Sequence, residues 1–293
     1  MSDLSETFTA HLESRILEET GDAFQVKAVE SVSGGCIHQA WKLDGDRCCY
    51  FLKTNKEALL GALLAEATGL LALAEVAAVR VPRPVCWGSC EGKSFLLMEY
   101  MELGIGHAGT QRRLGRELAA LHRNTGTSFG WKTDNFIGAS IQSNNCHEDW
   151  ATFWTECRLK PQIEWAVKRG LSPDRPQRLL DAVPRLLEGH EPAASLLHGD
   201  LWGGNIAALP DGTPVVFDPA CYYGDRETDI AFTEMFGGFS GDFYAAYQEA
   251  WPLPPGIGER KALYNLYHEL NHFNLFGGSY GRKAEATIAQ LLR

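Results

Sequence analysis

Short runs of alternating apolar and polar residues fill most of the first hundred positions, and a period of two predicts β-strands. A single helix, from about residue 56 to residue 76, interrupts these runs, and Glu66 and Glu75 break its apolar stretch. Turns of small or polar residues at 31–36 and 44–46 separate the first three runs. The strands that we expect are 24–29, 40–43, 48–53, 85–87 and 95–100.

Beyond residue 103 the apolar positions recur with helical spacing instead. Leu114, Leu118 and Leu121 lie on one face of a helix, and the aromatic-rich segment 150–169 predicts another. Only the segment 198–218 interrupts this pattern, as a loop followed by a short hairpin. The remaining residues are again expected to be helical.

This change of pattern predicts an α+β fold with two lobes. The small β-rich N-lobe is expected over residues 1–102, and the larger, mainly helical C-lobe over residues 103–293. A β-rich lobe that precedes a larger helical lobe is the architecture of protein kinases, so the parts of a kinase site are expected in chain order.

The loop that interrupts the helices has the residue types of a kinase catalytic loop. His198 and Gly199 precede Asp200, and Asn205 follows five residues later, before a strand-like run that ends at Asp218. In such a loop Asp200 would take or orient the proton of the attacking hydroxyl. Asn205 and Asp218 would hold Mg²⁺, which prefers a few hard oxygen ligands from protein. An ordinary turn and strand end is the alternative interpretation.

Three features of the N-lobe fit a nucleotide site. Gly34 and Gly35 lie between two expected strands, where free backbone N–H groups can cover phosphates, although an ordinary hairpin turn explains them equally well. Lys53 ends the third strand, where a kinase lysine contacts phosphates; a solvated lysine is the alternative. Glu66 lies in an apolar helix, where a carboxylate needs a partner, and Lys53 is the natural one.

The segment 98–101 would then be the hinge between the lobes. Its backbone at Glu99 and Met101 is expected to bind adenine. ATP and Mg²⁺ are therefore the expected cofactors. A nucleotide-binding protein without turnover is a different class of function, and the presence of the lysine, both aspartates and the asparagine argues against it.

Composition narrows the partners and the compartment. The chain has 293 residues, 45% of them hydrophobic, and a formal net charge of −10, which argues against nucleic acid as the main partner. No secretory signal is evident, and no stretch is expected to span a membrane. Eight cysteines are scattered without a C-x-x-C pair, so we expect reduced thiols and a cytoplasmic location.

Four segments together resemble the fructosamine kinase (ketosamine kinase) family. They are Ser33–Trp41, Phe51–Asn55, His198–Asn205 and Phe217–Ala220, and the segments 224–229 and 276–280 are similar too. The resemblance covers nearly the whole chain. It implies the protein-kinase-like fold of aminoglycoside phosphotransferases and ATP-dependent phosphorylation of the sugar 3-hydroxyl of ketosamines, free or protein-bound. It also implies a role in deglycation, because the 3-phosphate product is unstable. Another small alcohol, such as an aminoglycoside or choline, is the alternative acceptor.

Four further residues are candidates for the acceptor side of the site. Trp202, within the catalytic loop, would flank the sugar, or it only packs the loop. Asp225 or Asp229 could attract the amine of the substrate, although Asp229 could equally cap the start of a helix. His272 belongs to His268-Glu269-Leu270-Asn271-His272, a literal zinc-protease motif that lacks a third ligand, so a pocket or core histidine is the better interpretation.

Cys36 follows the two glycines of the expected phosphate loop. Nearby N–H groups and Lys53 would favour its thiolate, the reactive form. We therefore expect either a plain monomer, with Cys36 as a small loop residue, or a redox-dependent dimer.

Overall fold

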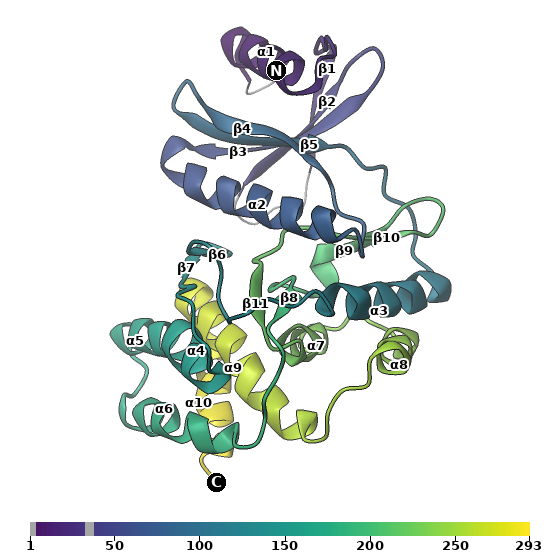
Figure 1. The fold of residues 1–293 in the computed structure, drawn as a ribbon. Coiled ribbons are helices and arrows are strands. Elements are labelled where there is room, and N and C mark those ends of the chain that lie inside the picture. Colours follow the sequence, from purple (N-terminus) through teal and green to yellow (C-terminus); the bar gives the residue numbers. More distant parts are fainter. Residues whose placement is uncertain (1–3, 33–37) are drawn as a thin grey trace.

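The N-terminal part of the chain is built on one antiparallel sheet in the order β1-β2-β3-β5-β4 (Figure 1). The computed structural model describes residues 4–32 and 38–293. Four of the strands lie close to their predicted positions, whereas the first begins later than the predicted 24–29. The strands are β1 (Ala28–Val32), β2 (Gln39–Asp44), β3 (Cys49–Lys56), β4 (Pro84–Cys90) and β5 (Lys93–Glu99).

A helix that the sequence pattern did not predict covers one face of this sheet. It is α1 (Glu6–Thr20), so the expectation of a single N-lobe helix was wrong. Ser5 caps its start by accepting from the N–H of Phe8, and Gly21 ends it in a left-handed conformation. Its buried residues recur every fourth position, and the first of them, Phe8, packs edge-on against Phe95 of β5 at 5.8 Å.

The other N-lobe helix is the one predicted between β3 and β4. A short 3₁₀ turn (Glu57–Leu59) leads into α2 (Leu60–Val76). Contrary to expectation, the segment Glu57–Val76 has the length and mean hydropathy (1.7) of a membrane span. In this fold it packs within the N-lobe and against the C-lobe, and Gly69 lies where an added Cβ would come within 3.2 Å of Pro219. The apolar stretch is thus a packing helix between the N-lobe sheet and the hairpin 135–142 of the C-lobe.

The larger part of the molecule is mainly helical (Figure 1). The predicted segment 150–169 is helical, but its middle turn, Trp154–Leu159, is a π-helix. The helix α9, central to this part, packs against α5, α7 and α10. The helices are α3 (Ala108–His122), α4 (Trp150–Phe153), α5 (Lys160–Lys168), α6 (Asp174–Leu186), α7 (Glu227–Thr233), α8 (Gly241–Ala250), α9 (Ile257–Phe276) and α10 (Ser279–Leu291).

Three two-stranded sheets lie between these helices and carry the loops of the site. The catalytic loop leaves β8 (Ser195–Leu197), which pairs with β11 (Tyr222–Gly224). A 3₁₀ turn (Gly203–Asn205) then leads into the predicted hairpin, β9 (Ile206–Ala208) with β10 (Pro214–Val216). The third sheet is the hairpin β6 (Asn135–Ile137) with β7 (Ser140–Gln142).

One hydrophobic cluster is shared by the two lobes. It joins Leu63 and Leu70 of α2 and Met98 of β5 to Leu118 of α3 and Val216 of β10, all buried. Burial of such side chains is the main favourable term in packing. The cluster therefore fixes the N-lobe sheet above the loop that ends at Asp218. The predicted boundary at residue 102 falls between β5 and α3.

Candidate active site

The backbone of the catalytic loop is held by a buried carboxylate from α7. Asp229 accepts hydrogen bonds from the N–H groups of His198 at 2.8 Å and of Gly199 at 2.9 Å. Its Oδ2 also lies 3.1 Å from Nε2 of the fully buried His122. Although burial alone raises the pKa of Asp229, its partner His122 holds that pKa below the usual range. Asp229 thus orients the loop just before Asp200, whereas the sequence suggested it only for the substrate amine or as a helix cap.

The structure brings Asp200 and Asn205 together at the end of this loop. Nδ2 of Asn205 donates to the backbone oxygen of Asp200 at 2.9 Å and to its carboxylate at 3.2 Å. The backbone oxygen of Asn205 accepts from the N–H of Phe217, the residue before Asp218. Because the amide nitrogen of Asn205 is turned toward Asp200, its Oδ1 is the atom left to serve as a metal ligand.

The electrostatics of Asp200 suit a group that handles a proton. Burial, together with the nearby Asp218 carboxylate, raises the pKa of Asp200 to about 7. The hydrogen bond from Asn205 acts in the opposite direction. A carboxylate with a pKa near neutrality can accept a proton from an alcohol and release it afterwards.

Lys53 links the N-lobe to the second predicted magnesium residue. Its Nζ lies 2.7 Å from Oε1 of Glu66 and also contacts Oδ1 of Asp218. Burial alone would lower the pKa of Lys53, but the carboxylates of Glu66 and Asp218 raise it, so the ammonium is charged. Although burial by itself raises the pKa of Asp218, Lys53 holds that pKa below its usual range. The predicted pairing of Lys53 with Glu66 is therefore present.

The backbone at Asp218 is unusual. Its φ is +58°, a left-handed conformation that side-chain-bearing residues adopt at a cost. Gly199 opposes it with a φ of +80°, and a Cβ on Gly199 would lie 2.1 Å from the backbone oxygen of Ala220. The N–H of Ala220 donates to the backbone oxygen of His198 at 2.9 Å. The two aspartate segments are thus packed directly against each other, which only glycine at position 199 allows.

The hairpin β6–β7 braces the same segment from the other side. Nδ2 of Asn135 donates to the backbone oxygen of Cys221 at 2.7 Å, and Nε2 of Gln142 donates to that of Ala220 at 3.2 Å. Gln142 in turn accepts from the hydroxyl of Tyr267 at 2.8 Å. Neither amide was predicted as a site residue, since they act through backbone atoms and no local motif marks them.

The structure describes only some of the other residues that were predicted to contact the nucleotide. Glu99 turns its side chain to Arg80 and to the N–H of Arg83, and its own N–H donates to the backbone oxygen of Arg83 at 2.9 Å. Only the backbone oxygen of Glu99 is left for a hinge role. Met101 is partly buried after β5. Gly34, Gly35 and Cys36 lie outside the described residues.

His38 follows that undescribed stretch and is a residue that the sequence analysis did not single out. Its Nδ1 lies 2.9 Å from Nδ2 of Asn55. Burial, and then the charge of Lys53, lowers the pKa of His38 to about 4. A neutral histidine therefore lies near the lysine end of the site.

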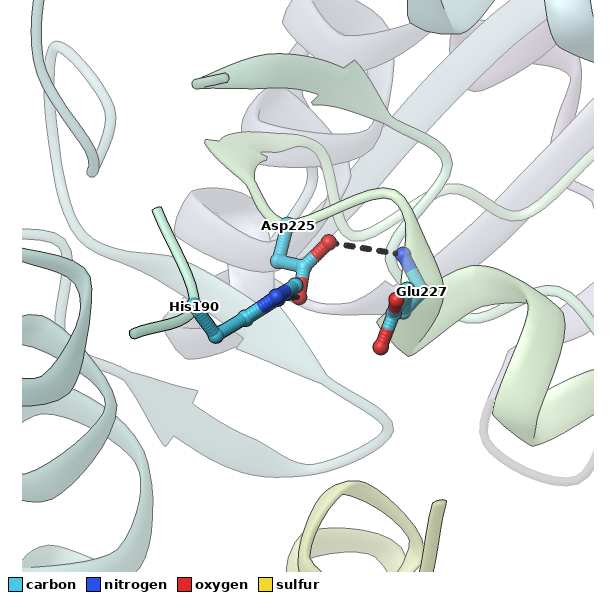
Figure 2. Close-up of side chains that lie close together, drawn as sticks. All are labelled: His190, Asp225 and Glu227. Atoms are coloured by element: carbon cyan, nitrogen blue, oxygen red, sulfur yellow. Dashed lines mark hydrogen bonds and ion pairs between the residues drawn. The ribbon is translucent and has the colours of Figure 1, made fainter. Parts of the chain in front are cut away.

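Asp225 does not face a substrate. Figure 2 shows its carboxylate between His190, whose Nε2 is 2.6 Å from Oδ2, and the backbone N–H of Glu227, which is 3.0 Å from Oδ1. The hydroxyl of Tyr264 donates to the same Oδ2 at 2.6 Å, and the residue is 1% exposed. The expectation that Asp225 attracts the amine is therefore wrong, because its hydrogen-bonding capacity is used internally.

The side chains of His190, Asp225 and Glu227 have metal-like spacing, with ligand atoms within 4.8 Å of one another. The guanidinium of Arg260, however, binds both carboxylate oxygens of Glu227, at 2.6 and 2.7 Å. Because Arg260 already neutralises Glu227, this cluster is a structural ion-pair network that joins α7 to α9.

The zinc-protease motif does not form a ligand pair. Nδ1 of His272 is 2.7 Å from the backbone oxygen of His268, which ties it to its own helix. The ring of His268 is buried and stacks on Phe232 at 3.5 Å. His272 is instead partly buried and packs near Phe236, and it thus lies at the edge of a group of aromatic rings.

Trp202 lies at the surface of the catalytic loop, with 37% of the residue exposed. Its ring covers Gly204, where a Cβ would come within 2.3 Å of the indole. Trp202 therefore packs on the loop and still presents a face to solvent, so both predicted roles remain compatible with its position.

The fold and the arrangement of Lys53, Glu66, Asp200, Asn205 and Asp218 define a phosphotransferase of the protein-kinase-like class. An aminoglycoside phosphotransferase solved with AMP-PNP and hygromycin B has the same fold, with a TM-score of 0.64 at 15% identity over 95% of this chain and 98% of that one. The model of the family described as fructosamine kinase matches residues 8–293. The chain belongs to this family and is an ATP-dependent phosphotransferase.

Relatives across bacteria and plants are similar over nearly their whole length. A probable ketoamine kinase of Synechocystis sp. is 47% identical over 281 residues, 95% of each chain. A chloroplastic protein-ribulosamine 3-kinase of Oryza sativa is 41% identical over 93% of this chain and 81% of its own. A crystal structure assigned as a fructosamine-3-kinase from Haemophilus somnus has a TM-score of 0.90 and 31% identity, over 96% of this chain and 97% of that one.

Proposed function

We propose that this protein phosphorylates the sugar 3-hydroxyl of ketosamines with ATP and Mg²⁺, and thereby contributes to deglycation. The observation that carries the proposal is the convergence of Lys53, Asp218 and the Asp200–Asn205 pair at one place between the lobes. The names of its relatives, ketoamine kinase and protein-ribulosamine 3-kinase, support a ketosamine as the acceptor class.

In this proposal Asp200 is the base. As the acceptor oxygen attacks the γ-phosphorus, its proton passes to the Asp200 carboxylate, and the bond from that phosphorus to the β–γ bridging oxygen breaks to release ADP. Burial raises the pKa of Asp200 to about 7, so proton transfer to Asp200 is less unfavourable than proton transfer to an ordinary aspartate. Asn205 and Asp229 keep Asp200 in place, one through its side chain and one through the preceding backbone.

Asn205 and Asp218 would hold the metal, and their chemistry fits it. Both offer hard oxygen atoms: Asn205 has Oδ1 free of its bond to Asp200, and Asp218 has the oxygen that Lys53 does not contact. Magnesium, when bound, neutralises charge on the phosphates. Lys53, held by Glu66, would position the same phosphates from the N-lobe side.

The other proposed contacts complete the site. Gly34 and Gly35 would cover the phosphates, and the backbone at Glu99 and Met101 would bind adenine. Trp202 would flank the sugar, and His272 would line the acceptor side, where its partly buried ring packs near Phe236.

We propose a cytoplasmic enzyme that acts on free or protein-bound ketosamines, with neither nucleic acid nor a membrane as a partner. We keep Cys36 as the residue for a redox-dependent dimer, with a plain monomer as the alternative.

The test is a substrate panel with the purified chain. Ribulosamines, erythrulosamines and fructosamines would be compared with an aminoglycoside and with choline, and ADP release and ³¹P NMR of the product would be recorded. We expect a sugar 3-phosphate from at least one ketosamine and none with Asp200→Asn. Turnover of only the aminoglycoside or choline would replace the acceptor. Nucleotide binding with no turnover of any hydroxyl compound would overturn the enzyme assignment.

A further inference from the structure

A group of exposed and partly exposed aromatic rings continues from the catalytic loop across the C-lobe. It consists of Trp202, Phe236, His272, Phe276 and Tyr280, and we call it the aromatic surface. The ring centroid of Phe236 lies 5.8 Å from that of Trp202 and 5.2 Å from that of His272. The ring centroid of His272 lies 5.8 Å from that of Phe276 and 5.0 Å from that of Tyr280. The exposed fractions of Trp202, Phe236 and Phe276 are 37%, 42% and 64%. Large apolar side chains rarely gather in solvent without a function.

Glycines bring the two loops of this surface into contact. A Cβ on Gly203 would lie 2.7 Å from the backbone oxygen of Gly237, and one on Gly204 would meet the ring of Trp202. Gly237 and Gly238 also have positive φ. The catalytic loop therefore packs backbone to backbone on the loop that carries Phe236, and this contact sets Phe236 beside Trp202.

The base of the surface is packed against buried rings and is uncharged. Phe236 packs at 5.9 Å on the buried Phe232, which stacks on His268. His272 is fixed by its bond to the backbone oxygen of His268. Burial lowers the pKa of both histidines, so neither ring carries a positive charge at neutral pH. Neutral aromatic rings attract cations through their faces.

Among the acidic residues near this surface, Glu234 and Glu269 each have a lysine partner, and Asp200, the proposed base, lies two residues before Trp202. Glu234 lies 2.5 Å from Lys261, and the buried Glu269 lies 3.4 Å from Lys283. Asp225, which the sequence suggested for the amine, is enclosed by His190 and Tyr264. Because Asp200 belongs to the reacting hydroxyl in the proposed function, recognition of the cationic part of an acceptor over this surface would depend on ring faces.

The position of the surface limits what it can contact. It begins at Trp202, two residues after Asp200, and ends where the last turn of α9 meets the first turn of α10, at the N-lobe side of the C-lobe in Figure 1. The phosphates belong with Lys53 on the other lobe. The part of an acceptor that extends from its reacting hydroxyl over this surface is the part farthest from ATP.

We propose that the aromatic surface binds the amine end of the acceptor, a secondary ammonium with its alkyl arm. Phe236, beside the Trp202 ring that flanks the sugar, faces the ammonium, and Phe276 contacts the alkyl arm. This inference rests on the proposed function, because a ketosamine carries its amine beside the sugar carbons that react. The surface thus selects acceptors by the length of the N-substituent, such as the side-chain stem of a glycated lysine.

The experiment compares N-methyl and N-hexyl ribulosamine as acceptors for the parent, Phe236→Ala and Phe276→Ala. Leu17→Ala is the matched control, because Leu17 is 49% exposed on α1, away from the site. We expect the parent and Leu17→Ala to prefer the hexyl compound through a lower KM. Phe276→Ala should lose roughly tenfold of that preference in kcat/KM, with kcat and the KM for ATP unchanged, since a few methylenes carry this much discrimination. An unchanged preference in both phenylalanine variants overturns the inference.

A binding measurement separates this inference from the proposed function. N-methylhexylammonium, which has no sugar, is titrated by NMR into the parent and into Phe276→Ala. Weaker binding to Phe276→Ala supports the binding role of the aromatic surface, whether or not any ribulosamine is phosphorylated. Absence of phosphorylation would contradict only the proposed function. Equal binding to the parent and to Phe276→Ala contradicts the role of the aromatic surface. Sedimentation velocity adds one more outcome: a parent dimer that Phe276→Ala turns into a monomer would make the surface an interface between copies instead.

Discussion

The carboxylate of Asp229 accepts a hydrogen bond from the N–H of Gly199 at 2.9 Å, one residue before Asp200. A second bond, from the N–H of His198, makes the contact bidentate. Asp229, a residue of α7, thus orients the loop that carries the proposed base. Asp229 is itself held by a hydrogen bond with His122. Preorganisation of this kind is how an enzyme positions a group without cost at the moment of reaction.

Asp229→Asn should loosen the loop. Asparagine keeps one oxygen and places an NH2 group where the other oxygen now accepts, so one of the two backbone N–H donors loses its acceptor. We therefore expect stability to fall by about 1–3 kcal/mol and kcat to fall roughly tenfold or more. Denaturant unfolding and steady-state kinetics would measure the two effects. Asp46→Asn, at an exposed turn, should change neither. A fully active Asp229→Asn enzyme would contradict the positioning role.

Gly199→Ala should be poorly tolerated. The new Cβ would lie 2.1 Å from the backbone oxygen of Ala220, in a backbone with φ of +80°. We expect a loss of about 2 kcal/mol or more in the free energy of unfolding, because both overpacking and strain contribute. Gly241→Ala is the matched control, since a Cβ there meets nothing within 4 Å. Equal melting temperatures for the two variants would disprove the close approach.

Asp200→Asn should leave the fold and nucleotide binding intact and lower kcat at least ~100-fold, the usual contribution of a positioned base. Binding of an ATP analogue by calorimetry and the thermal melting temperature are the controls for an intact site. Near-normal turnover by the folded variant would remove Asp200 from the role of base.

Asp218→Ala and Asn205→Ala should differ in their magnesium requirement. Asp218 supplies a charged oxygen that Lys53 already orients, whereas water can replace the neutral amide oxygen of Asn205. We therefore expect a larger rise in the half-saturating magnesium concentration for Asp218→Ala. Titration of activity with magnesium at saturating ATP gives the order, and an unchanged requirement in Asp218→Ala argues against its metal role.

His268 should make the protein less stable in acid. Burial, and then the nearby His272, lowers its pKa from 6.5 to about 3 in the folded chain, whereas the unfolded chain keeps the ordinary value. The unfolded state therefore binds the proton first. The contribution of His268 is complete above pH 6.5 and is lost as the pH falls toward 3, by at most about 1.4 kcal/mol per pH unit. His268→Phe should show a shallower loss of unfolding free energy between pH 6.5 and 4. An identical slope would refute it.

Local pattern determined much of this protein. Asp200 and Asn205 share one loop, and Asp218 ends the next hairpin, so their spacing alone predicted a common site. Lys53 and Glu66 are only 13 residues apart, on a strand and the helix that follows it, and their pairing was predicted correctly. The lobes followed from the change of period from two to helical spacing, because that period reflects which face each segment buries.

Tertiary structure alone decided the rest. The helix α1 has few apolar residues, and only the sheet that covers them makes it a stable element. The sequence left Asp225 available to a substrate, but in the fold it bonds to His190 and Tyr264, which are 35 and 39 residues away along the chain. The aromatic surface draws its rings from the catalytic loop, the loop after α7 and the helices α9 and α10. Such contacts depend on how distant segments pack, and a sequence pattern records only what neighbours along the chain share.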